Sequence, residues 1–214
     1  MRYAADEILD LVALEAHRAG GFVVGEDLGT VEDQVRAQLQ ERNVLSYRLL
    51  WFEDEPTSEF PVGALAAITT HDLPTVAGVH TGADLAETSA LGLAGDGSGD
   101  AYFKRKLQQA TGLDASAPVD DVIVAAHRAL AEAPSLVRLA TLEDALGVER
   151  RPNVPGTVDE RPNWRLPLPK PLEQLEHDPL LRRVAAAMEA GEQRAASATA
   201  TAHAEGGGDA MSDR

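Results

Sequence analysis

Apolar positions in the first third of the chain follow two different spacings. Over residues 4–19 they recur three and four positions apart, which is the spacing of an amphipathic helix, and glycines at 20 and 21 end the pattern. Short segments rich in apolar residues at 22–25, 45–52 and 64–69 instead predict strands, and the first has the pattern of a parallel strand that is covered on both faces. This alternation predicts βα units that build a parallel sheet.

A second helix is predicted between the first two strands. Thr30 and Asp33 have the spacing of a capping box, and Val35 and Leu39 fall on one face of the helix that follows. We therefore expect the chain to enter this helix at Thr30, with Val35 and Leu39 facing inward.

The pattern changes after residue 90. A glycine-rich stretch predicts a flexible loop, and a proline-rich stretch predicts irregular but packed structure. Small and polar residues dominate the end of the chain and predict a disordered tail. The expected elements are a loop at 91–100, helices at 101–110 and 120–133, a strand at 136–140, the proline-rich segment at 150–171, a last helix at 179–190 and the tail from 193.

Composition narrows the classes of function. The formal net charge is −16 and the sequence pI is about 4.7, so we expect neither nucleic acid nor a membrane as a partner. The chain contains no cysteine, which excludes disulfides and thiolate chemistry. No apolar stretch is long enough for a membrane helix, and the acidic start does not resemble a signal peptide. We expect a cytoplasmic protein that acts on a neutral molecule such as a carbohydrate.

Two acidic motifs come directly after predicted strands. Gly-Glu-Asp-Leu-Gly occupies residues 25–29, and Thr-His-Asp occupies residues 70–72. Because catalytic side chains of α/β barrels sit at the carboxyl ends of the strands, Glu26 and Asp72 are expected to lie close together. Two such carboxylates fit glycosidic bond chemistry, in which one exchanges a proton and another faces positive charge on the sugar.

Three segments carry a more specific resemblance. Val-Gly-Glu-Asp-Leu-Gly-Thr occupies residues 24–30, Thr-His-Asp-Leu-Pro-Thr residues 70–75, and Asn-Val-Pro-Gly-Thr residues 153–157, with Pro-Asn-Trp-Arg at 162–165 after it. In order and spacing these motifs resemble the 4-α-glucanotransferases (amylomaltases), relatives of the α-amylases. The resemblance extends from about residue 1 to about residue 190.

The resemblance implies an α/β fold in which this chain is the C-terminal half, strands five to eight, of a (β/α)8 TIM barrel with additional helices. Residues 1–146 would form the half-barrel, residues 147–192 a proline-rich packed segment and last helix of the same domain, and residues 193–214 a disordered tail. The 214 residues are fewer than the roughly 250 of a complete barrel. The family's nucleophilic aspartate belongs to an Arg-x-Asp-His type segment that this sequence lacks. We therefore expect a C-terminal fragment whose partner is the missing N-terminal half of the barrel.

The motifs also imply roles for individual residues. Glu26 would be the catalytic acid/base, Asp72 the stabiliser of the transition state, and His71 a hydrogen-bond partner of the sugar at the cleavage point. Asp27 either orients the site or caps the loop, and Asn153 either contacts the sugar or is a turn residue before Pro-Gly. His71, Asp27 and Asn153 are the candidate substrate-binding residues.

Other side chains have structural interpretations. Trp164 is chemically suited to stack on a sugar, but we favour core packing for it, and Trp51 and Phe52 are expected in the strand core. Arg48 either faces the barrel lumen or pairs with an acid. A metal site is not expected, because ligand spacing is absent at His80, His127, His177 and His203. A cofactor is not expected either, because carboxylates would provide all the chemistry that the resemblance implies.

These inferences predict that the complete enzyme transfers α-1,4-glucan segments between maltodextrins by retaining glycosyl transfer. The substrate would be maltodextrin or another α-1,4-glucan, and this fragment alone would be inactive because it lacks the nucleophile. Three alternatives stay open: an α-glucan hydrolase of the same clan, a non-catalytic half-barrel that binds α-glucans, and a truncated product without a stable fold. The last would associate through its open sheet edges and apolar interior.

Overall fold

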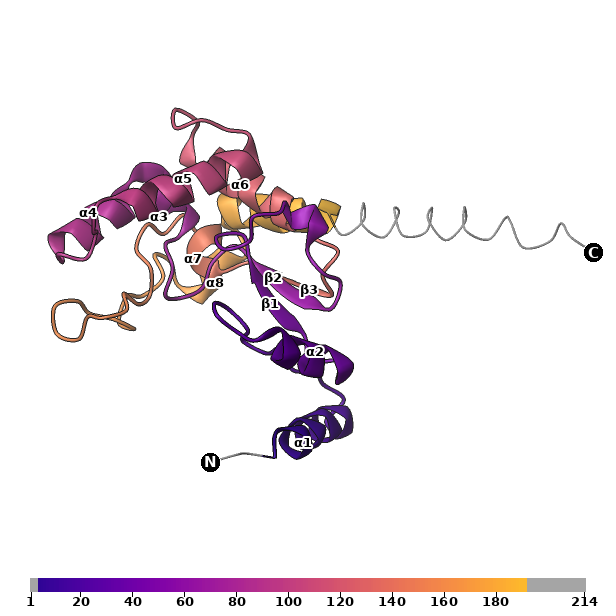
Figure 1. The fold of residues 1–214 in the computed structure, drawn as a ribbon. Helices are drawn as coiled ribbons and strands as arrows, with labels where there is room; N and C mark the ends of the chain where they lie inside the picture. The colour runs from indigo at the N-terminus through magenta and orange to yellow at the C-terminus, as the bar shows by residue number, and fades with distance from the viewer. Residues whose placement is uncertain (1–3, 192–214) are drawn as a thin grey trace, which may run out of the picture.

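Three short parallel strands form the sheet of this protein. The computed structural model describes residues 4–191, so the predicted tail lies outside the described residues. The strands are β1 (Ser46–Leu49), β2 (Ala64–Ala67) and β3 (Val137–Leu139), and they pair in the order β1-β2-β3 (Figure 1). The predicted α/β class with a parallel sheet is confirmed, although each strand is shorter than its apolar run.

The first predicted strand, at residues 22–25, is reduced to one parallel bridge between Val24 and Leu45. Two backbone hydrogen bonds of 2.8 and 2.9 Å flank this bridge. Phe22 at the start of the run is 64% exposed, so this part of the run lacks the cover that a buried strand needs. The run therefore approaches β1 without forming a full strand.

Helices make up most of the remaining regular secondary structure. Those predicted near residues 4–19, 101–110, 120–133 and 179–190 are present, whereas four short helices, α3, α4, α7 and α8, were not predicted from the sequence. The elements are α1 (Ala5–Arg18), α2 (Asp33–Glu41), α3 (Val76–Thr81), α4 (Ala83–Ala90), α5 (Ser98–Thr111), α6 (Val119–Leu130), α7 (Leu142–Ala145), α8 (Leu172–Leu175), a 3₁₀ turn η1 (Thr57–Glu59) and a helix over residues 179–191.

The start of α2 differs from the prediction. Its N-cap residue is Glu32 rather than Thr30, and no side chain caps the helix. Val35 is 39% exposed, so its predicted inward orientation is wrong. Arg36 instead faces the preceding loop and donates to the backbone carbonyl of Asp27 at 3.2 Å. This contact holds the loop that follows the first apolar run against α2.

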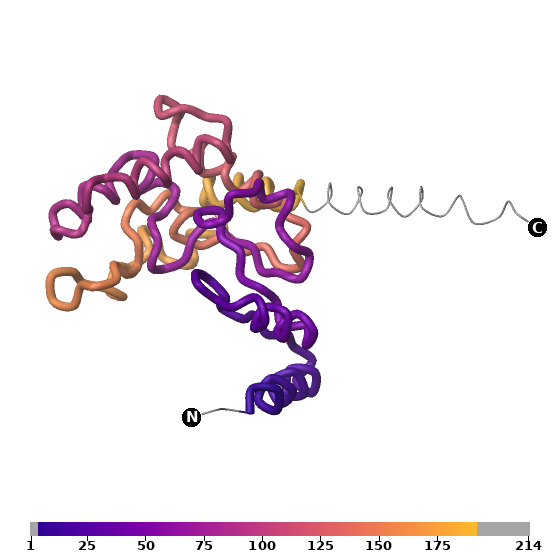
Figure 2. The backbone as a smooth tube through the Cα atoms, in the orientation of Figure 1, coloured from indigo at the N-terminus to yellow at the C-terminus, as the bar shows by residue number. Residues whose placement is uncertain are grey.

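The apolar stripe of α1 is not covered within the described residues. Ile8, Leu11 and Leu14 are between 43% and 60% exposed, and no residue of α1 is buried. An ion pair of 2.7 Å between Arg42 and Asp10 ties α1 to the end of α2. Figures 1 and 2 show α1 lying beside α2 and apart from helices α3 to α8. Within residues 4–191, no helix combines the length and the apolar character needed to cross a bilayer.

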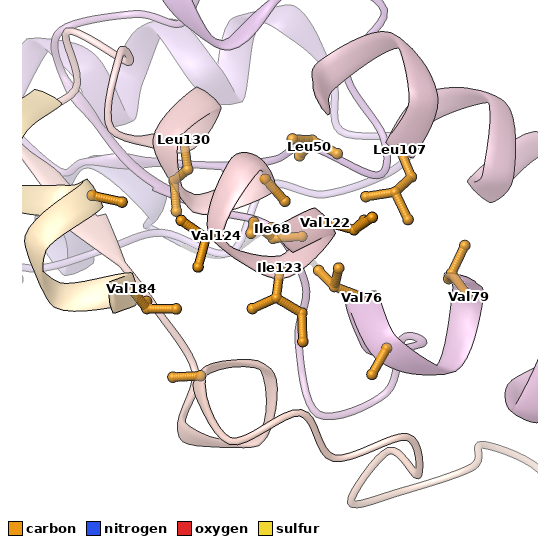
Figure 3. Close-up of a cluster of buried hydrophobic side chains, with 14 of the residues drawn as sticks. Leu50, Ile68, Val76, Val79, Leu107, Val122, Ile123, Val124, Leu130 and Val184 are labelled. Atoms are coloured by element: carbon orange, nitrogen blue, oxygen red, sulfur yellow. The ribbon is translucent and has the colours of Figure 1, made fainter. Parts of the chain in front are cut away.

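The main core lies between the sheet and helices α3, α5, α6 and 179–191. Figure 3 shows Ile68, Val76, Ile123 and Val184 converging from four different segments. Trp51 is fully buried in this core, as predicted, and its indole N–H donates to the carbonyl of Pro74 at 2.9 Å. The hydrogen bond joins the segment after β1 to the loop after β2.

A buried carboxylate joins two helix starts behind that loop. Asp144 accepts a hydrogen bond of 2.7 Å from the backbone N–H of Val76 in α3, and one of 3.0 Å from the hydroxyl of Thr141, the N-cap of α7. Burial raises the pKa of Asp144, although the nearby His127 and the hydrogen bonds oppose this effect. The segments after β2 and β3 are thereby held at a fixed separation.

We expect Gly78→Ala to destabilise the protein, because a Cβ atom at this position would lie 2.3 Å from the backbone oxygen of Glu149. Overpacking of this kind typically costs about 1–3 kcal/mol of the free energy of unfolding. Gly99→Ala is the matched control, since Gly99 also lies in a helix but has open space around it. Urea denaturation measures both variants, and equal stabilities would contradict the close approach at Gly78.

Candidate active site

The two predicted catalytic carboxylates line one cavity of about 810 Å³. Glu26 comes shortly after the Val24 bridge, Asp72 shortly after β2, and Thr141 shortly after β3, and all three face this cavity. The cavity therefore lies at the carboxyl ends of the parallel strands, where α/β folds bind ligands. Its volume is in the range of small-molecule sites.

Glu26 is positioned by its own loop. One carboxylate oxygen accepts a hydrogen bond of 2.8 Å from the backbone N–H of Leu28, and the side chain stays exposed. Tyr47 lines the cavity beside it. Burial raises the pKa of Tyr47, and the negative charge of Glu26 raises it further, so the phenol keeps its proton at neutral pH. The site thus offers a carboxyl group and a hydroxyl donor side by side.

Asp72 is oriented by two neighbouring side chains. The amide nitrogen of Asn153 donates to Oδ1 of Asp72 at 2.7 Å, and Nε2 of His71 lies 3.3 Å from the same oxygen. The backbone N–H of Asn153 also donates to the carbonyl of His71 at 3.0 Å. The second carboxylate oxygen of Asp72 is left for other partners. Asn153 thus orients the carboxylate of Asp72. This role differs from the two that the sequence suggested for Asn153, a sugar contact and a turn residue.

Asp27 does not line this cavity. It is 2% exposed, and its carboxylate accepts hydrogen bonds from the Ser46 hydroxyl at 2.6 Å and the Tyr47 backbone N–H at 2.8 Å. Arg36 lies 3.5 Å away. Asp27 therefore anchors the Glu26 loop to β1, which is the orienting role, and this geometry gives no support to a direct substrate contact. Of the two interpretations of Arg48, acid pairing is found, at 3.1 Å to Glu53.

Two aromatic side chains predicted in the core are at the cavity instead. Trp164 is 64% exposed and Phe52 is 45% exposed, and both line the cavity. The Trp164 ring lies 4.9 Å from that of His71, at an interplanar angle of 47°. Its backbone has a left-handed φ of 61°, a conformation that costs a non-glycine residue about 1–2 kcal/mol. In the sequence, only the polar neighbours Asn163 and Arg165 indicated that Trp164 is not in the core.

Ion pairs between two arginines and α4 hold the proline-rich loop in place. Arg151 donates to both carboxylate oxygens of Asp84 in α4, at 2.8 and 2.6 Å, and to the backbone carbonyl of Asp72 at 2.7 Å. Arg161, whose side chain is 1% exposed, donates to both oxygens of Glu87 in α4 at 3.1 and 3.2 Å. These bidentate pairs form a clamp, defined here as Asp84 and Glu87 with Arg151 and Arg161. Sequence reasoning did not find it, because its partners are more than 60 positions apart.

The clamp depends on the charge of its acids. Burial alone would raise the pKa of Glu87, but hydrogen bonds from Arg161 and Arg150 hold the pKa of Glu87 below its ordinary value of 4.5. A lowered pKa in the folded state means that the charged form stabilises the fold. This contribution is complete above pH 4.5 and is lost as the pH falls through the lowered pKa.

Metal-binding geometry is not found in the described part of the chain. Between residues 4 and 191, no group of three or more histidine or acidic side chains is arranged to hold an ion.

Sequence comparisons match the chain to one enzyme family. The model of the 4-alpha-glucanotransferase family matches residues 1–173. The chain is 38% identical over 194 residues to the 4-alpha-glucanotransferase of Mycobacterium tuberculosis and 32% identical over 195 residues to that of Haemophilus influenzae. These alignments cover 80% of this chain but 26% and 28% of the relatives, so the chain spans about a quarter of the length of the curated relatives it matches.

Solved structures show the same fold. The amylomaltase from Corynebacterium glutamicum superimposes with a TM-score of 0.78 at 30% identity, over 88% of this chain and 31% of that one. An amylomaltase from Streptococcus agalactiae, solved in complex with acarbose, gives a TM-score of 0.52 at 18% identity over 78% of this chain and 30% of that one, which supports the fold alone. The chain belongs to the 4-alpha-glucanotransferase family.

Replacing Glu87 with glutamine should lower the free energy of unfolding at neutral pH by about 2 kcal/mol, because Arg161 would lose a charged partner while staying buried. The difference from the wild type should shrink as the pH falls from 4.5 through the lowered pKa of Glu87, because the wild-type glutamate then loses its charge as well. Urea denaturation over a pH series measures this. Glu189→Gln, at an exposed position of the last helix, serves as control. A difference that stays constant with pH would contradict the clamp.

Proposed function

We propose that the protein to which this chain belongs transfers segments of α-1,4-linked glucan between maltodextrins, with retention at the anomeric carbon. In this proposal residues 4–191 are the second half of a (β/α)8 barrel, with the Val24 run and β1 to β3 as strands five to eight. The parallel sheet, membership of the family and the superposition on the C. glutamicum amylomaltase support this assignment.

The observation that carries the proposal is the convergence of Glu26 and Asp72, with His71, on one cavity. The two motifs are far apart in sequence, and neither is needed to build the core. Retaining glycosidases use such a carboxyl group to protonate the departing oxygen and later to take the proton of the acceptor hydroxyl. We assign this role to Glu26.

Asp72 would then face the positive charge that develops on the sugar ring in the transition state. Its carboxylate is held by Asn153 and approached by His71, so it needs little reorganisation during the reaction. His71, which is half exposed, is free to hydrogen-bond a sugar hydroxyl. All the chemistry assigned to this chain is proton transfer and electrostatic stabilisation by its own side chains.

The nucleophile is assigned to a segment outside this chain. In a retaining enzyme the nucleophile and the acid/base carboxylate stand roughly 5 to 5.5 Å apart, so the nucleophile must line the same cavity as Glu26. In the described residues the acidic side chains that line the cavity are Glu26, Asp72 and Glu143. Glu143 follows β3, whereas the resemblance to the family implies a nucleophile in a segment that precedes the Glu26 motif. Glu26 is exposed here, so the low-dielectric surroundings that keep an acid protonated would come from bound sugar or from other parts of the full-length protein.

In the full-length protein, Glu26→Gln should reduce the disproportionation of maltotriose by about 100-fold to 10,000-fold, the usual contribution of a positioned acid/base. Glu32→Gln, which changes an exposed glutamate at the start of α2, should leave the rate unchanged. Chromatography of the products separates transfer from hydrolysis, because transfer yields longer chains and hydrolysis yields only shorter ones. Full activity of Glu26→Gln would remove the proposal.

The 214-residue chain by itself should not disproportionate maltotriose, because a retaining reaction needs a nucleophilic carboxylate that this chain does not supply. Product analysis at high protein concentration tests this, with the full-length protein as the positive control. Turnover by the isolated chain would show that one of its own carboxylates, Glu143 first, acts as nucleophile. Titration with maltoheptaose under the same conditions tests the non-catalytic binding alternative.

A further inference from the structure

Trp164 has three properties that core packing does not explain. It belongs to the wall of the cavity, it is 64% exposed, and its backbone is in the left-handed region at a φ of 61°. Large aromatic side chains usually bury most of their surface, and bulky residues rarely adopt a positive φ. An exposed side chain on a backbone with unfavourable dihedral angles is held in place by the surrounding structure rather than by the conformational preference of the residue.

Several hydrogen bonds within the loop around Trp164 fix the position of this residue. The backbone N–H of Trp164 donates to the carbonyl of Pro152 at 3.0 Å. The side chain of the preceding residue, Asn163, accepts a hydrogen bond from Arg161 at 2.9 Å and donates to the hydroxyl of Thr157 at 2.7 Å. Arg161 is itself part of the clamp with α4. These contacts keep the indole at the cavity although its backbone conformation is unfavourable.

We propose that Trp164 is a substrate-positioning residue whose indole packs against a glucose ring of the bound glucan. This proposal rests on the proposed function of the site. The C–H groups on a face of a pyranose ring are apolar and weakly positive, and the face of an indole is apolar and carries negative charge density. An exposed indole beside polar groups is therefore suited to a ring that presents C–H groups on its face and hydroxyls at its edge.

The position of Trp164 also indicates which ring it contacts. His71 lies between Trp164 and Asp72: its ring centroid is 4.9 Å from that of Trp164, and its Nε2 is 3.3 Å from Oδ1 of Asp72. Trp164 thus lies one side chain away from the carboxylate assigned to the reacting sugar. We infer that it contacts a neighbouring ring of the chain and fixes the register of the glucan in the site.

The competing role for Trp164 is to pack against another part of the full-length protein. In that case sugar would not reach the indole, and its fluorescence would not respond to substrate. The sequence contains one other tryptophan, Trp51, which is fully buried and hydrogen-bonded to Pro74, so a response to sugar from this chain must come from Trp164.

The test uses the full-length protein with Glu26→Gln, which slows turnover, and maltoheptaose as the probe. Maltoheptaose should shift the tryptophan emission to shorter wavelength, and the shift should be smaller when Trp164→Phe is added, because the contribution of Trp164 is lost. Calorimetry should show binding weakened about 10-fold by Trp164→Gly and largely restored by Trp164→Phe. Trp164→Gly relieves the positive φ, so its melting temperature should not fall, which separates loss of a sugar contact from loss of structure.

The outcomes separate this proposal from the function on which it rests. Unchanged maltoheptaose affinity in Trp164→Gly, or an emission spectrum that maltoheptaose does not alter while calorimetry records binding, would overturn the role of Trp164 and leave the transferase intact. Weakened binding without rescue by phenylalanine and with a lower melting temperature would also overturn it, in favour of a structural role. Absence of maltotriose disproportionation by the wild-type protein would instead overturn the proposed function.

Discussion

Parallel pairing of three short strands is the constraint on which the site depends. In a parallel sheet every strand ends at the same edge, so polar residues placed after different strands meet in space whatever their separation in sequence. Glu26 follows the parallel Val24 bridge next to β1, Asp72 follows β2 and Thr141 follows β3, and all three reach one cavity for this reason. The strands contain only three or four residues each, and the helices packed on the sheet supply most of the buried apolar surface that holds them together.

Polar contacts then set the fine position of the candidate catalytic carboxylates. Asp27 anchors the Glu26 loop to β1, Asn153 holds the Asp72 carboxylate, and the clamp with α4 holds the loop that carries Asn153. Several of these groups are buried, where an unpaired charge is expensive, so each is matched by a hydrogen-bonded partner. The apolar core sets the distance between the strand ends, and the buried polar network sets the direction of the side chains.

The uncovered apolar surface fits a chain that spans about a quarter of its relatives. Ile8 and Leu11 of α1 and Leu139 of β3 are 45% to 60% exposed, which is unusual for large apolar side chains. In a full-length member of the family we expect further segments of the same protein to pack there. The same surface is the reason to expect the isolated chain to associate.

Much of this protein was determined by the sequence alone. The apolar runs and helical spacing predicted the parallel α/β sheet and most helices, because these patterns report local burial. The strand-end motifs located Glu26, His71 and Asp72. The tertiary structure decided the features that depend on distant partners. Val35 is exposed rather than inward-facing, and the N-cap of α2 is Glu32 rather than Thr30. Trp164 and Phe52 line the cavity, although the sequence predicted them in the core. The clamp and the positive φ of Trp164 arise from contacts between segments many residues apart, for which no local pattern exists.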